Sequence, residues 1–292
     1  MKCKTVIYIF LFFLTFCSRQ TPNEGLVIAV SIPPQAWFVS QIAGEKCEII
    51  ILAGQGQNPH NYEPGPRQLQ SLSSAGSWIL SGTEFEISLQ PKIRALFPDL
   101  PIVDGTEGVF FRMLSEHEHE HDDHETEHAS IEIDRHTWLG REPAKILAAH
   151  IKDTLLSLDR ENRDYYLERY ESLVLLIDDE FDRLKNDLAD MKGKKVFVYH
   201  PSFGYFLDEF GIIQEAVETG GKEPGPRALN QLINEIKEEQ PAAVFVQSQF
   251  PVNAARNLAE AVNAQLISLD PLAQDWLENI RSMGQALKKA MP

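Results

Sequence analysis

The sequence contains one half-length pattern twice, and this repeat limits the fold more than any other feature. Its clearest part is the pentapeptide EPGPR, which occurs at 63–67 and again at 223–227. Each copy places a proline where a helix is expected to begin. Apolar, strand-like runs recur in the same order around it, pairing 26–30 with 195–199, 78–81 with 244–247, and 101–104 with 266–270. A long repeat present only twice predicts two similar lobes rather than a solenoid.

Strands and helical patterns alternate within each half, so the predicted class is α/β, with a parallel sheet covered by helices on both faces in each lobe. The expected division is an N-terminal lobe at 25–140, connecting helices at 141–192 and a C-terminal lobe at 193–292. Apolar residues spaced by four and three predict one long helix from Arg160 to Met191, with Asp159 as its N-cap. At 1.5 Å per residue it would be about 48 Å long and would run along both lobes as a rigid connection. An ordinary amphipathic helix without a mechanical role fits the same pattern.

The N-terminus predicts export. Residues 1–16 are predicted to be a signal peptide. They contain an apolar run from Val6 to Phe16, which is too short to span a bilayer, since that needs about 20 residues. The segment Leu14-Thr15-Phe16-Cys17 resembles a bacterial lipobox, with Cys17 as the lipid site, although Phe16 replaces the usual small residue. We therefore expect a periplasmic or other extracytoplasmic protein, attached to a membrane only if Cys17 is lipidated. Cys47 would then be the single cysteine left for a disulfide, so none is expected.

A histidine-rich segment at 116–128 interrupts the first half. It holds seven carboxylates and no apolar residue, which predicts a solvated loop. Its imidazoles and carboxylates could bind a divalent ion loosely and exchangeably, and an acidic linker is the alternative. The histidines of this auxiliary segment are His117, His119, His121, His124 and His128. The formal net charge of −16 disfavours nucleic acid and anionic lipid as partners and favours a cationic ligand.

Three other histidines and one aspartate form a candidate metal site. His200 and Asp270 follow predicted strands, His60 precedes the first EPGPR helix, and His136 lies where the chain becomes apolar again. Because ligands bind at the carboxyl ends of strands in open parallel sheets, three of these four side chains are expected on facing rims of the lobes, and His136 is the least constrained of the four. Three imidazoles and a carboxylate suit tetrahedral zinc, whereas manganese prefers more oxygen ligands. His150 lies within a helical pattern and is interpreted as a packing residue.

Several motifs are similar to those at the metal site of ZnuA-like solute-binding proteins, which belong to ABC importers for zinc and manganese. They are NPHNYEP at 58–64, RHTWL at 135–139, YHPSFGYF at 199–206 and LDPL at 269–272. The resemblance implies a zinc ion between two lobes, bound by His60, His136 and His200, with Asp270 or a water as the fourth ligand. Manganese-binding relatives have Glu at the position of His200, which favours zinc. Arg135 and Gln247 depart from the Asp and Glu that are usual in the family.

The resemblance implies a monomeric binding protein, not an enzyme, that delivers Zn²⁺ to an ABC permease and its ATPase. Three alternatives remain at this point: a manganese-binding homologue, a metal-buffering or adhesin lipoprotein of the same fold, and a zinc hydrolase. The hydrolase is the weakest, because the HExxH patterns, HEHEH at 117–121 and HETEH at 124–128, lie in the predicted solvated segment and not on a predicted helix, and the sequence contains no nucleophile elbow.

Overall fold

The computed structural model describes residues 25–114 and 133–217, and beyond them 230, 233–234, 236–238, 241, 243–247, 249 and 252–290. The predicted signal peptide, Cys17, the histidine-rich segment 116–128 and the second EPGPR copy lie outside the described residues. Among the helices that are described, none combines the length and the apolar character needed to cross a membrane.

The first half folds into a four-stranded parallel sheet with the strand order β2-β1-β3-β4. Helix α2 begins at Pro66, so the first EPGPR copy starts a helix as predicted. Its elements in chain order are β1 (Leu26–Val30), α1 (Pro33–Ala43), β2 (Cys47–Ile51), α2 (Pro66–Ser71), β3 (Ser77–Leu80), α3 (Glu84–Leu96) and β4 (Ile102–Asp104).

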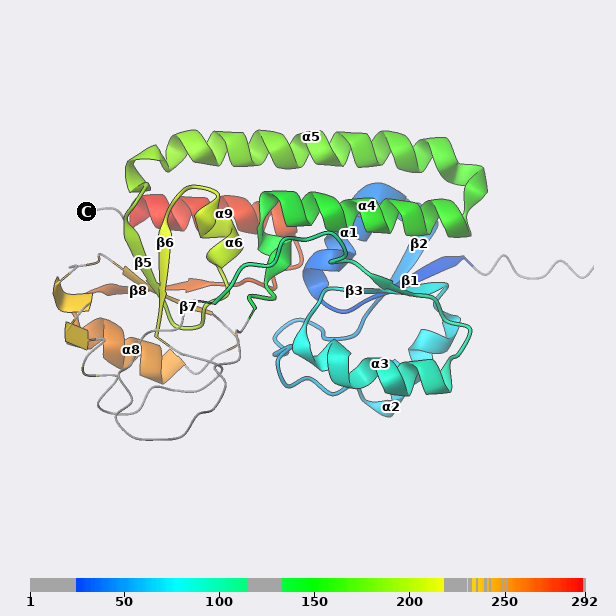
Figure 1. Ribbon diagram of the computed structural model, residues 1–292, viewed down its shortest axis with the longest axis horizontal. Coiled ribbons are helices and arrows are strands. Elements are labelled where there is room, and N and C mark those ends of the chain that lie inside the picture. The colour runs from blue at the N-terminus through cyan, green and yellow to red at the C-terminus, as the bar shows by residue number, and fades with distance from the viewer. Residues whose placement is uncertain are drawn as a thin grey trace, which may run out of the picture.

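The second half repeats this topology, with the order β6-β5-β7-β8 and all neighbours parallel (Figure 1). The two matching sheets confirm the predicted fold class. In both sheets the chain places its third strand on the other side of its first, so the loops after these two strands meet at a topological switch point. The described elements are β5 (Lys195–Val198), α6 (Gly204–Asp208), β6 (Ile213–Ala216), β7 (Ala243–Gln247), α8 (Val252–Ala261), β8 (Gln265–Leu269) and α9 (Trp276–Lys289).

Two helices join the halves, and the predicted long helix between 160 and 191 is present, with 3-10 turns at both of its predicted ends. Helix α4 covers Arg141–Leu158 and α5 covers Arg163–Asp187, with short 3-10 turns before and after α5. Asp159 ends α4 instead of capping α5, and Asn162 takes the N-cap position. The Asp159 carboxylate accepts hydrogen bonds from Asn162 Nδ2 at 2.7 Å and the Tyr166 hydroxyl at 2.6 Å. These bonds hold the reversal between the two helices.

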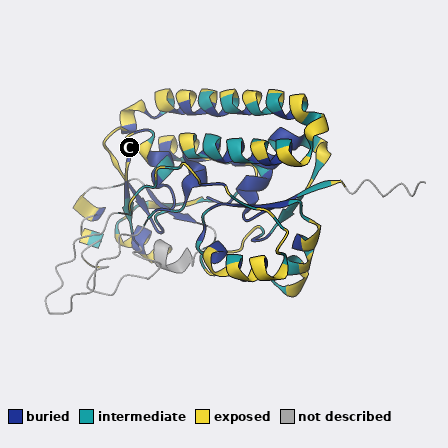
Figure 2. Ribbon diagram, turned by 45° about the vertical axis from the view of Figure 1, so that its right-hand side comes forward, coloured by how far each residue is buried: buried dark blue, intermediate teal, exposed yellow. Residues whose placement is uncertain are grey.

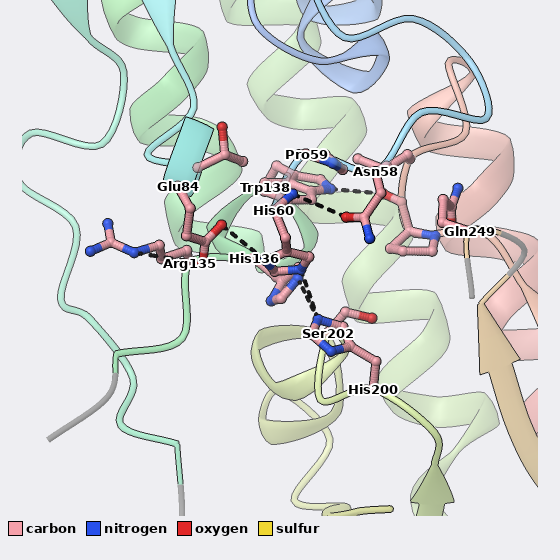
Figure 3. Close-up of a pocket in the computed structure, with 13 residues that line it drawn as sticks. Asn58, Pro59, His60, Glu84, Arg135, His136, Trp138, His200, Ser202 and Gln249 are labelled. Carbon is pink, nitrogen blue, oxygen red and sulfur yellow. Dashed lines mark hydrogen bonds and ion pairs between the residues drawn. The ribbon is translucent and has the colours of Figure 1, made fainter. Parts of the chain in front are cut away.

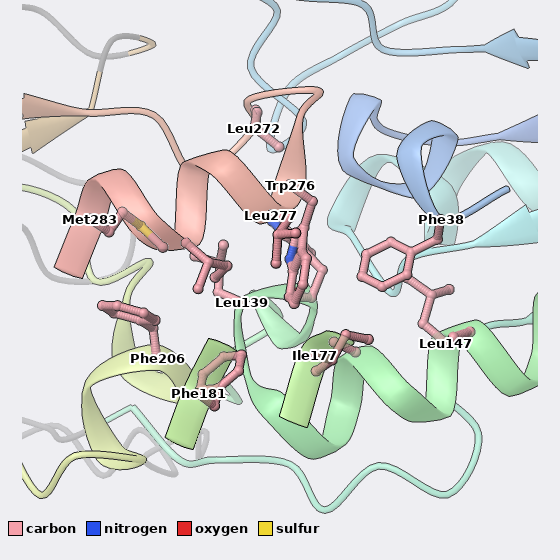
Figure 4. Close-up of a cluster of buried hydrophobic side chains, with 14 of the residues drawn as sticks. Phe38, Leu139, Leu147, Ile177, Phe181, Phe206, Leu272, Trp276, Leu277 and Met283 are labelled. Atoms are coloured by element: carbon pink, nitrogen blue, oxygen red, sulfur yellow. The ribbon is translucent and has the colours of Figure 1, made fainter. Parts of the chain in front are cut away.

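The lobes share one apolar core. Helix α5 extends over both lobes in Figure 1, and the largest buried cluster contains residues of α1, α4, α5, α6 and α9 (Figure 4). At its centre, Trp276 of α9 lies 4.9 Å from Phe38 of α1, between ring centroids, and 6.3 Å from Phe181 of α5. Figure 2 shows exposed residues along the outer side of α5 and buried ones toward the sheets. Separating the lobes would expose this cluster to water, which opposes wide opening.

Candidate metal centre

Three imidazoles from distant parts of the chain converge between the lobes. His60 comes from the loop after β2, His136 precedes a 3-10 turn at Thr137–Leu139, and His200 follows β5. The Nε2 atom of His200 lies 3.0 Å from Nε2 of His60 and 3.4 Å from Nε2 of His136 (Figure 3). Among the described residues these three form a group with ligand atoms within 4.8 Å of one another, close enough to bind one ion.

A carboxylate orients His60. Glu84, the first residue of α3, places Oε2 3.1 Å from His60 Nδ1, so the other ring nitrogen faces His200. Burial alone would raise the pKa of Glu84, but the hydrogen bond and charge of His60 lower it to about 2. The backbone N–H of His60 also donates to Asn58 Oδ1 at 3.0 Å. The imidazole ring and the backbone of His60 are therefore both held in place.

The loop that presents Glu84 is held by a buried acid. Glu86 accepts hydrogen bonds from the backbone N–H of Ser81 at 2.7 Å and of Gly82 at 2.8 Å. Burial raises the pKa of Glu86, against the opposing effect of these hydrogen bonds. The carboxylate thus fixes the turn between β3 and α3, and with it the start of the helix that carries Glu84.

A second carboxylate orients His136. Oδ1 of the fully buried Asp134 lies 2.9 Å from both the backbone N and the Nδ1 of His136. Arg112 places NH1 3.5 Å from the other Asp134 oxygen. Asp134 was not predicted from the sequence, because the family usually has its acid directly before the histidine, at position 135. Arg135, at that adjacent position, instead donates to the Gly82 carbonyl at 3.0 Å.

Gln247 at the end of β7 supports the third imidazole. Its Oε1 accepts from the backbone N–H of His200 at 3.2 Å, and its Nε2 donates to Ser202 Oγ at 2.8 Å and to the His200 carbonyl. The side chain is fully buried. An amide both accepts and donates here, which a carboxylate could not do, and this explains physically why glutamine fits this position.

Asp270, the predicted fourth ligand, does not belong to the group of converging ligand atoms. Its Oδ1 accepts from Gln249 Nε2 at 2.6 Å and from the backbone N–H of Leu272 at 2.9 Å. The two residues after it, Pro271 and Leu272, line the cavity. His150 lies on α4 with Nε2 2.9 Å from the Glu107 carbonyl, away from the group.

The cavity around the imidazoles combines a few polar groups with an apolar wall. Glu84, Arg135 and Gln249 are among the polar side chains that line it, while Trp138 and Leu272 contribute apolar surface. His136 and His200 are largely buried and His60 is partly exposed. Three neutral imidazoles in such a setting present lone pairs to a borderline divalent cation.

Known proteins share both the sequence pattern and the fold. The family described as ZnuA, zinc-uptake complex component A, periplasmic, matches residues 28–290. The high-affinity zinc uptake system protein ZnuA of Yersinia pestis is 27% identical over 84% of this chain and 82% of its own. Its namesake in Bacillus subtilis is 24% identical over 87% and 81%. A crystal structure of ZnuA superposes with a TM-score of 0.83 and 30% identity, covering 91% of this chain and 99% of that one. With nearly its whole length matched, the chain belongs to the ZnuA family of solute-binding proteins.

Proposed function

We propose that the protein captures Zn²⁺ between its lobes, using Nε2 of His60, His136 and His200 as ligands. The convergence of these three nitrogen atoms on one point carries the proposal. Zinc is bound by imidazole nitrogen at about 2.0 to 2.1 Å and prefers four ligands in a tetrahedron. The fourth is a water or Asp270, whose Oδ1 already accepts hydrogen bonds from Gln249 and from the backbone of Leu272.

The surroundings of the imidazoles support zinc over manganese. All three converging atoms are nitrogen, whereas manganese favours oxygen ligands. Glu84 and Asp134 each lie against the Nδ1 of a histidine, which holds the proton there and leaves the lone pair of the ring on Nε2, the atom that faces the other imidazoles. Such carboxylate–histidine pairs raise the basicity of the ligand.

The relatives named above support a role in uptake. Proteins of this family are solute-binding proteins, so the chain binds and releases its ligand and is not an enzyme. We place it outside the cytoplasmic membrane, where it delivers Zn²⁺ to an ABC permease and its ATPase as a monomer. Lipid attachment at Cys17 is part of the same proposal and rests on the lipobox-like sequence alone.

Metal titration tests the proposal directly. The metal-free protein should bind one Zn²⁺ tightly and Mn²⁺ far more weakly in competition with a chelator. His136→Ala and His200→Ala should each remove the tight site, while His150→Ala, a histidine outside the group, should keep it. Growth of a zinc-import-deficient strain should be restored by the wild type and not by His200→Ala. Preference for Mn²⁺, or tight binding that survives both site substitutions, would overturn the assignment.

A further inference from the structure

Two tryptophans next to the imidazoles form reciprocal hydrogen bonds between the lobes. Trp138 follows His136 by two residues, and its ring centroid is 5.4 Å from that of the histidine. Its indole Nε1 donates to the Pro271 carbonyl at 2.8 Å, in the loop between β8 and α9. In return, Trp276 at the start of α9 donates its Nε1 to the Trp138 carbonyl at 2.6 Å. Figure 3 shows Trp138 beside the histidines.

Both indoles are buried, so neither indole N–H can replace its protein acceptor with water. Trp276 is fully buried and Trp138 is 3% exposed. A buried indole N–H needs an acceptor, and each one finds a main-chain carbonyl on the opposite side of the lobe junction. The pair therefore fixes the backbone around His136 against the loop that carries Asp270.

The surrounding packing fixes Trp276 itself. Its ring lies 5.4 Å from Trp37 and 4.9 Å from Phe38, both on α1 of the N-terminal lobe (Figure 4). On its other side, Asn279 of α9 donates to the Asp270 carbonyl at 2.7 Å. Helix α9 thus contacts three parts of the molecule: α1 and the His136 turn through Trp276, and the loop after β8 through Asn279.

We infer that Trp276 is a positioning residue of the metal centre, which sets the place of His136 relative to the other lobe without touching the ion. This inference rests on the proposed zinc site. Loss of its hydrogen bond would leave His136 on a backbone free to shift, and a centre whose ligands come from both lobes tolerates little displacement. Changes in groups that orient a ligand typically lower metal affinity by about 10- to 100-fold.

Trp276→Phe and Trp78→Phe form a matched pair for the test. Trp78 on β3 is also fully buried, and its Nε1 donates to Ser31 Oγ at 3.1 Å, within one lobe. Both substitutions remove an indole and one hydrogen bond from a buried site, so both should lower the unfolding temperature. Only Trp276→Phe should weaken Zn²⁺ binding, by about tenfold. The visible spectrum of bound Co²⁺, which reports ligand geometry, should change in that variant alone.

The outcomes separate the inference from the function on which it rests. If the wild type binds one Zn²⁺ tightly and Trp276→Phe binds it equally well, the inference is wrong and the zinc site stands. Equal losses of affinity in both variants would also overturn it, because a general loss of stability would then explain the result. If Trp276→Phe does not fold, 3-benzothienylalanine incorporated at position 276 provides the test, since it keeps the shape of the indole and removes only the N–H that donates to the Trp138 carbonyl; unchanged Zn²⁺ affinity would then overturn the inference. A wild type without a tight zinc site overturns the proposed function and the inference together.

Discussion

Asp134 determines how His136 can act as a ligand, because its negative charge lies next to Nδ1 of that imidazole. Because Oδ1 of Asp134 lies 2.9 Å from His136 Nδ1, the substitution Asp134→Asn keeps an acceptor there but removes the negative charge. We expect Zn²⁺ affinity to fall by about tenfold, measured by competition with a chelator. Asp208→Asn is the control, because Asp208 also pairs with Arg112, at 2.7 Å, but is part of α6 and not of the centre. Equal affinity in both variants would contradict a role for the Asp134 charge.

Glu84 gives a pH-dependent prediction for the metal-free protein. Its pKa falls from 4.5 to about 2 in the folded state, so the ionised carboxylate stabilises the fold above pH 4.5. That contribution is lost as the pH drops toward 2. The difference in free energy of unfolding between the wild type and Glu84→Gln should therefore shrink over this range, in urea titrations at pH 5, 4 and 3. Glu48→Gln, at an exposed position of β2, should show no such trend. A constant difference for Glu84→Gln would exclude the proposed pairing with His60.

The sequence allowed the histidines to be selected but not the groups that orient them. His60, His136 and His200 stand beside recognisable motifs, and the repeat places His200 at the end of a strand and His60 just before a repeated helix. Glu84 and Asp134 act through contacts that depend on how the loops fold, and nothing in their local sequence marks them. Asp270 was located correctly, directly after β8. Its hydrogen bond from Gln249 to Oδ1 could not be predicted from the sequence.

At the scale of elements, the contact between α5 and α9 depends on a buried acid. Glu180 of α5 is 5% exposed, and its Oε2 accepts from Arg281 Nε of α9 at 2.8 Å. Arg281→Met should destabilise the protein by about 1–2 kcal/mol, because Glu180 would lose one of its two charged partners within the described part of the chain and keep Arg183. Thermal unfolding measures the effect. Lys288→Met, which breaks an exposed pair between the same two helices, should change little. A larger loss for Lys288→Met would contradict this account.

The sequence predicted the succession of elements better than their ends. Alternating strand and helix patterns indicated two parallel sheets, and their shared strand order follows from the repeat. The long helix was predicted about one turn too long at each end, because a 3-10 turn of three residues is too short for apolar spacing to distinguish it from an α-helix. Asp159 is a typical N-cap residue, but its carboxylate is used by Tyr166 to close the turn between α4 and α5.

At the scale of the whole molecule, the centre depends on how the two halves are held together. The apolar cluster around Trp276 and Phe38 crosses the lobe junction, and the imidazoles lie beside it. Such a shared core makes a wide hinge motion costly, so metal binding should involve local adjustment of the loops that carry the ligands. Small displacements at these loops are consistent with a site whose three nitrogen atoms are already close together.

Removing residues 116–128 tests whether the histidine-rich segment belongs to the tight site. The three converging imidazoles lie outside it, and its neighbours are tied together by the bridge between Met113 and Ile133 and by Asp134 N–H donating to the Arg112 carbonyl at 2.8 Å. The deletion variant should therefore keep one tight Zn²⁺ site and bind less zinc in total, as measured by calorimetry. A second variant with the five histidines of the segment changed to Asn keeps its length and carboxylates. It should match the deletion if imidazoles bind the additional zinc, and the wild type if carboxylates do. Loss of tight binding in either variant would place the segment in the primary site.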